Sequence, residues 1–118
     1  MSIASIYYKD ANIILLVLDC ENEESLDRAE DYLERIYEET KNTKIFLVIN
    51  KCDLLPGFEE NGEMSEDVKR KCTFYSSILS FAKKNSLQLF WVSAKSGNSV
   101  ENLFSYLIDN IYNGGIYI

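Results

Sequence analysis

The stretch IFLVINKCD at residues 45–53 decides the fold. Its first five residues form a short, continuous apolar run, which is typical of a strand buried on both faces, as in a parallel sheet. Two more apolar runs occupy residues 13–18 and 87–92. We therefore predict three parallel strands, at about 13–19, 45–50 and 87–92.

Amphipathic stretches alternate with these runs. Apolar residues recur at spacings of three and four over residues 23–39, 65–84 and 99–112, which predicts one helix in each stretch. The order strand–helix repeated three times implies right-handed crossovers and a parallel sheet. We expect an α/β fold in three layers, formed by a single domain over residues 1–118.

The composition excludes several classes of function. The 118 residues carry 12 basic and 19 acidic side chains, a net charge of −7, so nucleic-acid binding is not expected. Histidine is absent, which removes Ser–His and Cys–His nucleophile pairs and His-ligated metals. The three cysteines fit neither a zinc pattern nor a disulfide framework, and we interpret them as packing residues. Without a secretory signal or a membrane-spanning run, we expect a cytoplasmic protein with no metal site.

Polar clusters follow two of the predicted strands directly. Residues 50–53, Asn-Lys-Cys-Asp, come after the second strand, and residues 93–95, Ser-Ala-Lys, come after the third. In an open parallel sheet, ligands bind at the carboxyl ends of the strands. We expect these two clusters to be neighbours at one edge of the sheet and to form the ligand site. Asp19 follows the first strand, and we interpret it as the cap of a turn.

At these residues the chain resembles the Ras superfamily of small GTPases. Residues 50–53 are similar to the NKxD guanine-specificity motif of that family, and residues 93–95 are similar to its SAK motif. Residues 7–11 and 18–25 resemble two consecutive segments of the Rab branch, YYRGA and YDxTNxxSF. Short matches at residues 2–6 and 85–87 also resemble the endosomal branch of the Rab proteins. The resemblance implies a partial Ras-like P-loop NTPase fold that corresponds to the C-terminal part of the family's domain.

The resemblance implies a guanine site made of six residues: Asn50, Lys51, Asp53, Ser93, Ala94 and Lys95. The Asp53 carboxylate is suited to accept both the ring N–H and the exocyclic amine of guanine, a donor pair that adenine lacks. The Ala94 N–H is placed to donate to the keto oxygen, and the stems of Lys51 and Lys95 to cover the faces of the base. Asn50 has two roles open to it, a hydrogen bond to the base or a tie between the two loops.

The family's phosphate-handling segments are absent from the 118 residues. There is no GxxxxGK[ST] phosphate loop, no switch threonine and no DxxG segment that would hold magnesium. Residues 57–62 have the GxxxxG spacing, but Glu63 and Met64 follow where Lys and Ser or Thr are required. We expect no catalytic residue, no magnesium site, GTP or GDP binding that is weak at best, and no hydrolysis by this chain alone.

Expectations about partners follow from the same resemblance. The strand at 13–18 would be an exposed apolar sheet edge, and we expect two chains to pair through it as a homodimer. Tyr7 and Tyr8 are candidates for binding Rab-type effectors or regulators. No cysteine follows Cys72, so the family's prenyl anchor is not expected.

Three hypotheses follow for the function. The first is a truncated, Rab-like small GTP-binding protein of vesicle trafficking, cytoplasmic and peripheral to endomembranes. The second is a non-enzymatic interaction protein or dimerising remnant that binds the partners of full-length Rab proteins. The third is a fragment whose missing half comes from another polypeptide. The family's enzyme activity is GTP hydrolysis.

Overall fold

A single parallel sheet organises the chain. The computed structural model describes residues 13–39, 43–60, 64–110 and 116–117. The sheet has the strand order β3-β2-β1-β4, and every neighbouring pair is parallel. Its strands are β1 (Ile13–Asp19), β2 (Lys44–Asn50), β3 (Gln88–Trp91) and β4 (Ile116–Tyr117). The helices are α2 (Glu24–Glu39), α3 (Glu66–Lys69), α4 (Tyr75–Lys84) and α5 (Val100–Asn110), with a 3-10 turn at Cys52–Leu54.

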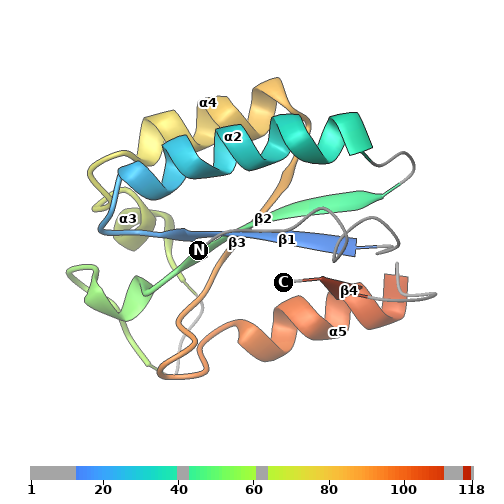
Figure 1. The fold of residues 1–118 in the computed structure, drawn as a ribbon. Helices are drawn as coiled ribbons and strands as arrows, with labels where there is room; N and C mark the ends of the chain where they lie inside the picture. The colour runs from blue at the N-terminus through green and yellow to red at the C-terminus, as the bar shows by residue number, and fades with distance from the viewer. Residues whose placement is uncertain (1–12, 40–42, 61–63, 111–115, 118) are drawn as a thin grey trace.

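Helices cover both faces of the sheet. Figure 1 shows α2 and α4 side by side over one face and α5 against the other. This arrangement confirms the predicted three-layer α/β fold and its three long strands. The strands begin and end within about one residue of the expected positions.

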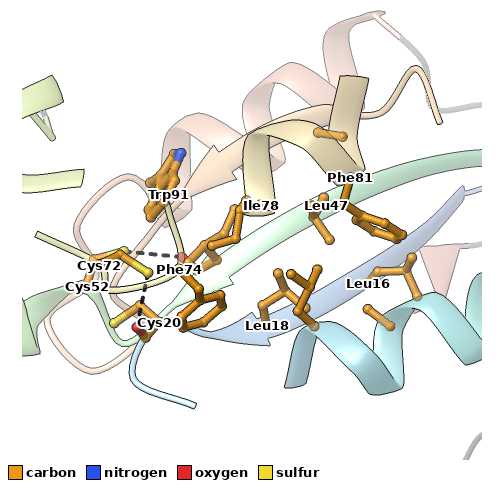
Figure 2. Packing of buried hydrophobic residues seen from close by; sticks show 14 of the residues in the cluster. Leu16, Leu18, Cys20, Leu47, Cys52, Cys72, Phe74, Ile78, Phe81 and Trp91 are labelled. Atoms are coloured by element: carbon orange, nitrogen blue, oxygen red, sulfur yellow. Dashed lines mark hydrogen bonds between the residues drawn. The ribbon is translucent and has the colours of Figure 1, made fainter. Parts of the chain in front are cut away.

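The core lies in two clusters because side chains alternate along each strand. Ile14, Leu16 and Leu18 of β1 belong to the cluster beneath α2 and α4, whereas Ile13 and Leu15 belong to the cluster against α5. Figure 2 shows the first cluster, with the labelled side chains Leu16, Leu18, Leu47, Ile78 and Phe81 packed together. A strand with both faces buried explains why β1 and β2 are continuous apolar runs instead of alternating ones.

The helix predicted at 65–84 is wrong in one respect, because two helices occupy that stretch. α3 and α4 are separated by residues 70–74. Cys72 and Phe74 are both buried, at 3% exposure each. Residues two apart point away from each other on a continuous helix, so burying both side chains requires a break. No glycine or proline marks that break in the sequence.

The expectation of an unpaired edge at residues 13–18 is also corrected. β4 pairs with β1 at Ile13 and Ile14, so the sheet has a fourth strand on that side. Of the six residues, only Val17 has an exposed side chain, at 39%, because helices cover both faces of the strand. Leu15 to Asp19 have a ladder partner on the β2 side alone among the described residues. A strand of two residues is too short to leave a periodic pattern in the sequence.

Tyr7 and Tyr8, the candidates for partner binding, lie outside the described residues. In the described parts of the chain, no helix is both long and apolar enough to cross a membrane.

Adjacent residues on α4 provide a test of the core. Ile78 is fully buried in the cluster beneath α2 and α4, whereas Leu79 is 37% exposed. We expect Ile78→Ala to lower the free energy of unfolding by about 2–5 kcal/mol, because it leaves a cavity. Leu79→Ala is the control and should cost less than about 1 kcal/mol. Urea denaturation followed by circular dichroism measures both, and equal losses would contradict the packing.

Candidate functional site

The carboxyl end of β2 turns sharply into the first predicted motif. Asn50 is the last residue of the strand, and Lys51 adopts a left-handed backbone conformation with φ of 66°. The turn at Cys52–Leu54 is closed by hydrogen bonds from Leu54 N–H to Lys51 O and from Leu55 N–H to Cys52 O. This turn leaves Asp53 half-buried beside the end of β3.

The end of β3 is joined to the same turn. Val92 N–H donates to Ile49 O over 2.8 Å, and Cys52 N–H donates to Val92 O over 3.1 Å. The fully buried Ser93 hydroxyl then donates to Asp53 Oδ1 over 2.7 Å. Residues that are 40 positions apart in the sequence are therefore in direct contact.

A second hydrogen bond ties the two motifs together. Ala94 N–H donates to the side-chain oxygen Asn50 Oδ1 over 2.9 Å. Of the two roles open to Asn50, the structure shows the second, a hydrogen bond that ties the two loops together. The Ala94 N–H is thereby engaged, so a guanine keto oxygen would have to share that N–H with Asn50 Oδ1 or displace the Asn50 oxygen. Ala94 and Lys95 are exposed, which leaves the site open to solvent.

The Asp53 carboxylate keeps the capacity to bind a ligand. An ionised carboxylate offers about four lone-pair positions, and the Ser93 hydroxyl uses one of them. Two hydrogen bonds thus bring four of the six predicted residues into one cluster, and Lys51 and Lys95 lie next to it along the chain. The Asp53 carboxylate is therefore a planar acceptor that can take up donors from a ligand.

Lys51 makes a contact that the sequence did not indicate. Its Nζ lies 2.9 Å from Asp19 Oδ2, at the end of the neighbouring strand. Asp19 also accepts a hydrogen bond from Glu21 N–H, which agrees with its interpretation as a turn cap. Partial burial alone would raise the pKa of Asp19, but the Glu21 hydrogen bond and the Lys51 ammonium outweigh it and lower that pKa. The same ion pair raises the pKa of Lys51.

Asn98 is a site residue that sequence reasoning missed. Its side chain is 7% exposed, and its Nδ2 donates to the carbonyl oxygens of Glu59 and Glu60 over 3.1 and 2.9 Å. The backbone carbonyl of Asn98 accepts a hydrogen bond from Ser93 N–H. Asn98 therefore braces the loop of the second motif against the loop that follows the first. An asparagine before a helix usually indicates a cap, so the sequence carried no signal for this role.

Three buried thiols underlie the site. The thiols of Cys20, Cys52 and Cys72 donate to backbone carbonyls of Lys51, Ile49 and Cys20, respectively. Figure 2 shows Cys20, Cys52 and Cys72 close together beside Phe74. A hydrogen bond with Cys20, together with burial, raises the pKa of Cys52, and burial raises the pKa of Cys72. No group of three metal-ligating side chains occurs among the residues that the structure describes.

A groove of about 230 Å³ continues from the site along β1. Asn50, Lys51 and Asp19 line one end of it, with Arg28 from α2. Leu15 to Leu18 and Tyr32 line the apolar remainder. The groove therefore joins the polar strand ends to the open side of β1.

Comparisons with known proteins agree with the motifs. The family model described as the Ras family matches residues 1–113. The chain is 28% identical over 110 residues to the GTP-binding protein YPT53 of Saccharomyces cerevisiae, which covers 92% of this chain and 47% of that protein. It is 31% identical over 113 residues to the Ras-related protein RABA4b of Arabidopsis thaliana, covering 95% of this chain and 45% of that protein. The chain thus spans about half the length of the curated relatives it matches.

The buried Asn98 amide offers a test of how the two loops are held. Asn98→Ala removes a buried amide that donates to the carbonyl groups of Glu59 and Glu60. We expect a loss of about 1–3 kcal/mol in the free energy of unfolding, because two hydrogen bonds of about 0.5–1.5 kcal/mol each would be lost. The exposed Asn102 on α5 is the matched control, and Asn102→Ala should change stability by less than about 0.5 kcal/mol. Chemical denaturation measures both variants, and a neutral Asn98→Ala would refute the bracing role.

Proposed function

Because the chain belongs to the Ras family and matches Rab-type relatives, we propose that it recognises guanine nucleotides through Asn50–Asp53 and Ser93–Lys95. The 118 residues would be the C-terminal part of a Rab-like domain. The single observation that carries the proposal is the pair of hydrogen bonds joining the two motifs, Ser93 to Asp53 and Ala94 to Asn50. These bonds join Asn50, Asp53, Ser93 and Ala94, four of the residues proposed to recognise the base, and so support the proposal.

Specificity for guanine would come from Asp53. Guanine presents a ring N–H and an exocyclic amine side by side, and one carboxylate accepts from both. Adenine has no such pair, so an adenine base would leave the half-buried carboxylate without donors. Ser93 supports this role because its hydroxyl bond to Oδ1 fixes the orientation of the carboxylate. The stems of Lys51 and Lys95 would supply apolar contact to the base.

Affinity would be low for these 118 residues by themselves. The sequence contains no GxxxxGK[ST] segment and no DxxG segment, so the phosphates and magnesium have no binding groups of the family's type here. A base held by one carboxylate and two stems corresponds to a Kd on the order of millimolar. Phosphoryl transfer depends on positioning and charge stabilisation, so we also propose that the chain alone does not hydrolyse GTP.

The cellular role we propose follows the Rab resemblance. The protein would take part in vesicle trafficking, in the cytoplasm and at the periphery of endomembranes. Effectors or regulators of Rab type would be its protein partners, with Tyr7 and Tyr8 as candidate contacts. A second polypeptide that supplies phosphate-binding groups is a variant of the same proposal.

A second candidate function is protein interaction through β1. Leu15 to Asp19 have a ladder partner on one side alone among the described residues, and a groove of about 230 Å³ runs beside them. Strands with an unpaired edge form templates for pairing with another chain. Two copies related by a two-fold axis would pair in antiparallel fashion, centred on Val17, where the partners' side chains meet. A homodimer of this kind would have a definite register.

Calorimetry tests the nucleotide proposal. We expect GDP to bind with a Kd on the order of millimolar, with or without magnesium, and ADP to bind more weakly. Asp53→Asn keeps an oxygen for the Ser93 hydroxyl but removes the carboxylate, so GDP affinity should fall by about tenfold or more. Asp67→Asn, on the exposed face of α3, is the control and should leave affinity unchanged. Absence of saturable GDP binding, or equal binding by both variants, would contradict the proposal.

Sedimentation velocity tests the interaction candidate. We expect the wild-type chain to dimerise at micromolar concentration, and Val17→Lys to shift it to monomer, because a charge would be buried against its symmetry mate. Ile108 is an exposed hydrophobic residue on α5, at 59%, and Ile108→Lys is the control that should leave the dimer intact. A wild-type monomer throughout the concentration range would rule out the homodimer.

A further inference from the structure

The register of the sheet brings Asp19 next to the candidate guanine site. Asp19 lies opposite Asn50 in the parallel ladder, and Cys20 N–H donates to Asn50 O over 3.1 Å. The first residue beyond β2 is Lys51, whose side chain reaches back toward β1. A carboxylate from one strand and an ammonium from the next therefore meet at the carboxyl edge of the sheet.

The Asp19 carboxylate is held from its own loop. Oδ1 accepts from Glu21 N–H over 2.9 Å, and the Asp19 backbone N–H donates to the buried Ser25 hydroxyl oxygen over 3.0 Å. Ser25 in turn donates to Asn22 O over 2.6 Å. With one carboxylate oxygen used by the turn, the other oxygen, Oδ2, meets Lys51 Nζ at 2.9 Å.

Lys51 gains order from this contact. Its backbone is already unusual, with φ of 66°, and its side chain is 57% exposed. An exposed lysine stem samples many rotamers and loses that freedom when a ligand binds against it. A partner that restrains the ammonium before binding reduces this loss. Two other charged groups act on the pair. Arg28 lowers the pKa of Asp19 and Glu21 raises the pKa of Lys51, each by less than the ion-pair partner does.

We propose that Asp19 is a positioning residue of the guanine-recognition site, whose carboxylate holds the Lys51 ammonium and so sets the path of the Lys51 stem beside the base. The inference rests on the function proposed above and extends it to a residue outside the six. Asp19 acts through Lys51 and does not itself contact the ligand.

Two substitutions separate this role from the turn-capping role of Asp19. Asp19→Asn keeps an oxygen that accepts from Glu21 N–H, and asparagine forms the same kind of turn, so the loop is preserved. The substitution removes the charge that faces Lys51. Lys51→Met keeps an apolar stem of similar length but removes the ammonium. If Asp19 acts through the ammonium, Asp19→Asn has no further effect in the Lys51→Met background.

The experiment combines two NMR titrations of the folded, full 118-residue chain. The first follows the Lys51 side-chain resonances against pH without ligand, and Asp19→Asn should lower the Lys51 pKa. The second follows amide shifts against guanosine, which carries the base without phosphates. We expect Asp19→Asn to weaken guanosine binding by about three- to fivefold in the wild-type background and not at all beside Lys51→Met.

Each alternative outcome points to a different failure. A lowered Lys51 pKa with unchanged guanosine affinity overturns the positioning role, although the ion pair exists. An equal loss of affinity in both backgrounds overturns it as well, because Asp19 would then act by another route. If the wild-type chain fails to bind guanosine, the proposed guanine recognition itself falls, and the positioning role falls with it.

Discussion

The parallel pairing of β2 with β1 and β3 fixes where the polar ends of the strands lie. A strand inside a sheet with helices on both faces has no exposed side in its middle, so Phe46 to Ile49 of β2 are all apolar and buried. Polar residues can then begin only where the strand ends. The register places Asp19 opposite Asn50, and the β3 end follows through the Val92 hydrogen bonds. Three strand ends therefore deliver their first polar side chains to the same edge of the sheet.

At that edge, hydrogen bonds made by side chains hold the loops together where the backbone pairing of the sheet ends. The buried Ser93 hydroxyl donates to Asp53, and the Asn50 side chain accepts from Ala94 N–H. Asn98 donates to two backbone carbonyls of the loop that follows the first motif. The Ser93 and Asn98 side chains are buried and would be costly to leave without partners. The result is a site arranged before any ligand arrives, with a carboxylate that retains acceptor positions.

Much of the fold was predictable because it depends on local composition. The three long strands and the helices α2 and α5 follow from continuous apolar runs and from amphipathic spacing. The break between α3 and α4 was not predictable, since Phe74 leaves the helix to fill the core, and no local signal marks it. The short strand β4 was missed for a similar reason: two residues pair because Ile13 and Ile14 are there to receive them. Burial of the β1 side chains likewise depends on helices distant in the sequence.

For the site, the residue types, their order at the strand ends and the family resemblance that they carry can all be read from the sequence. A carboxylate, an amide and two lysines at fixed spacing are properties of the chain. Tertiary structure alone decided which group pairs with which. Asn50 became a tie between loops, Lys51 became the partner of Asp19, and Asn98 became a brace. These contacts join residues that are 32 to 44 positions apart in the sequence, and the strand register sets the distances between them. A local pattern contains no information about that register, because pairing is fixed only when the whole sheet forms.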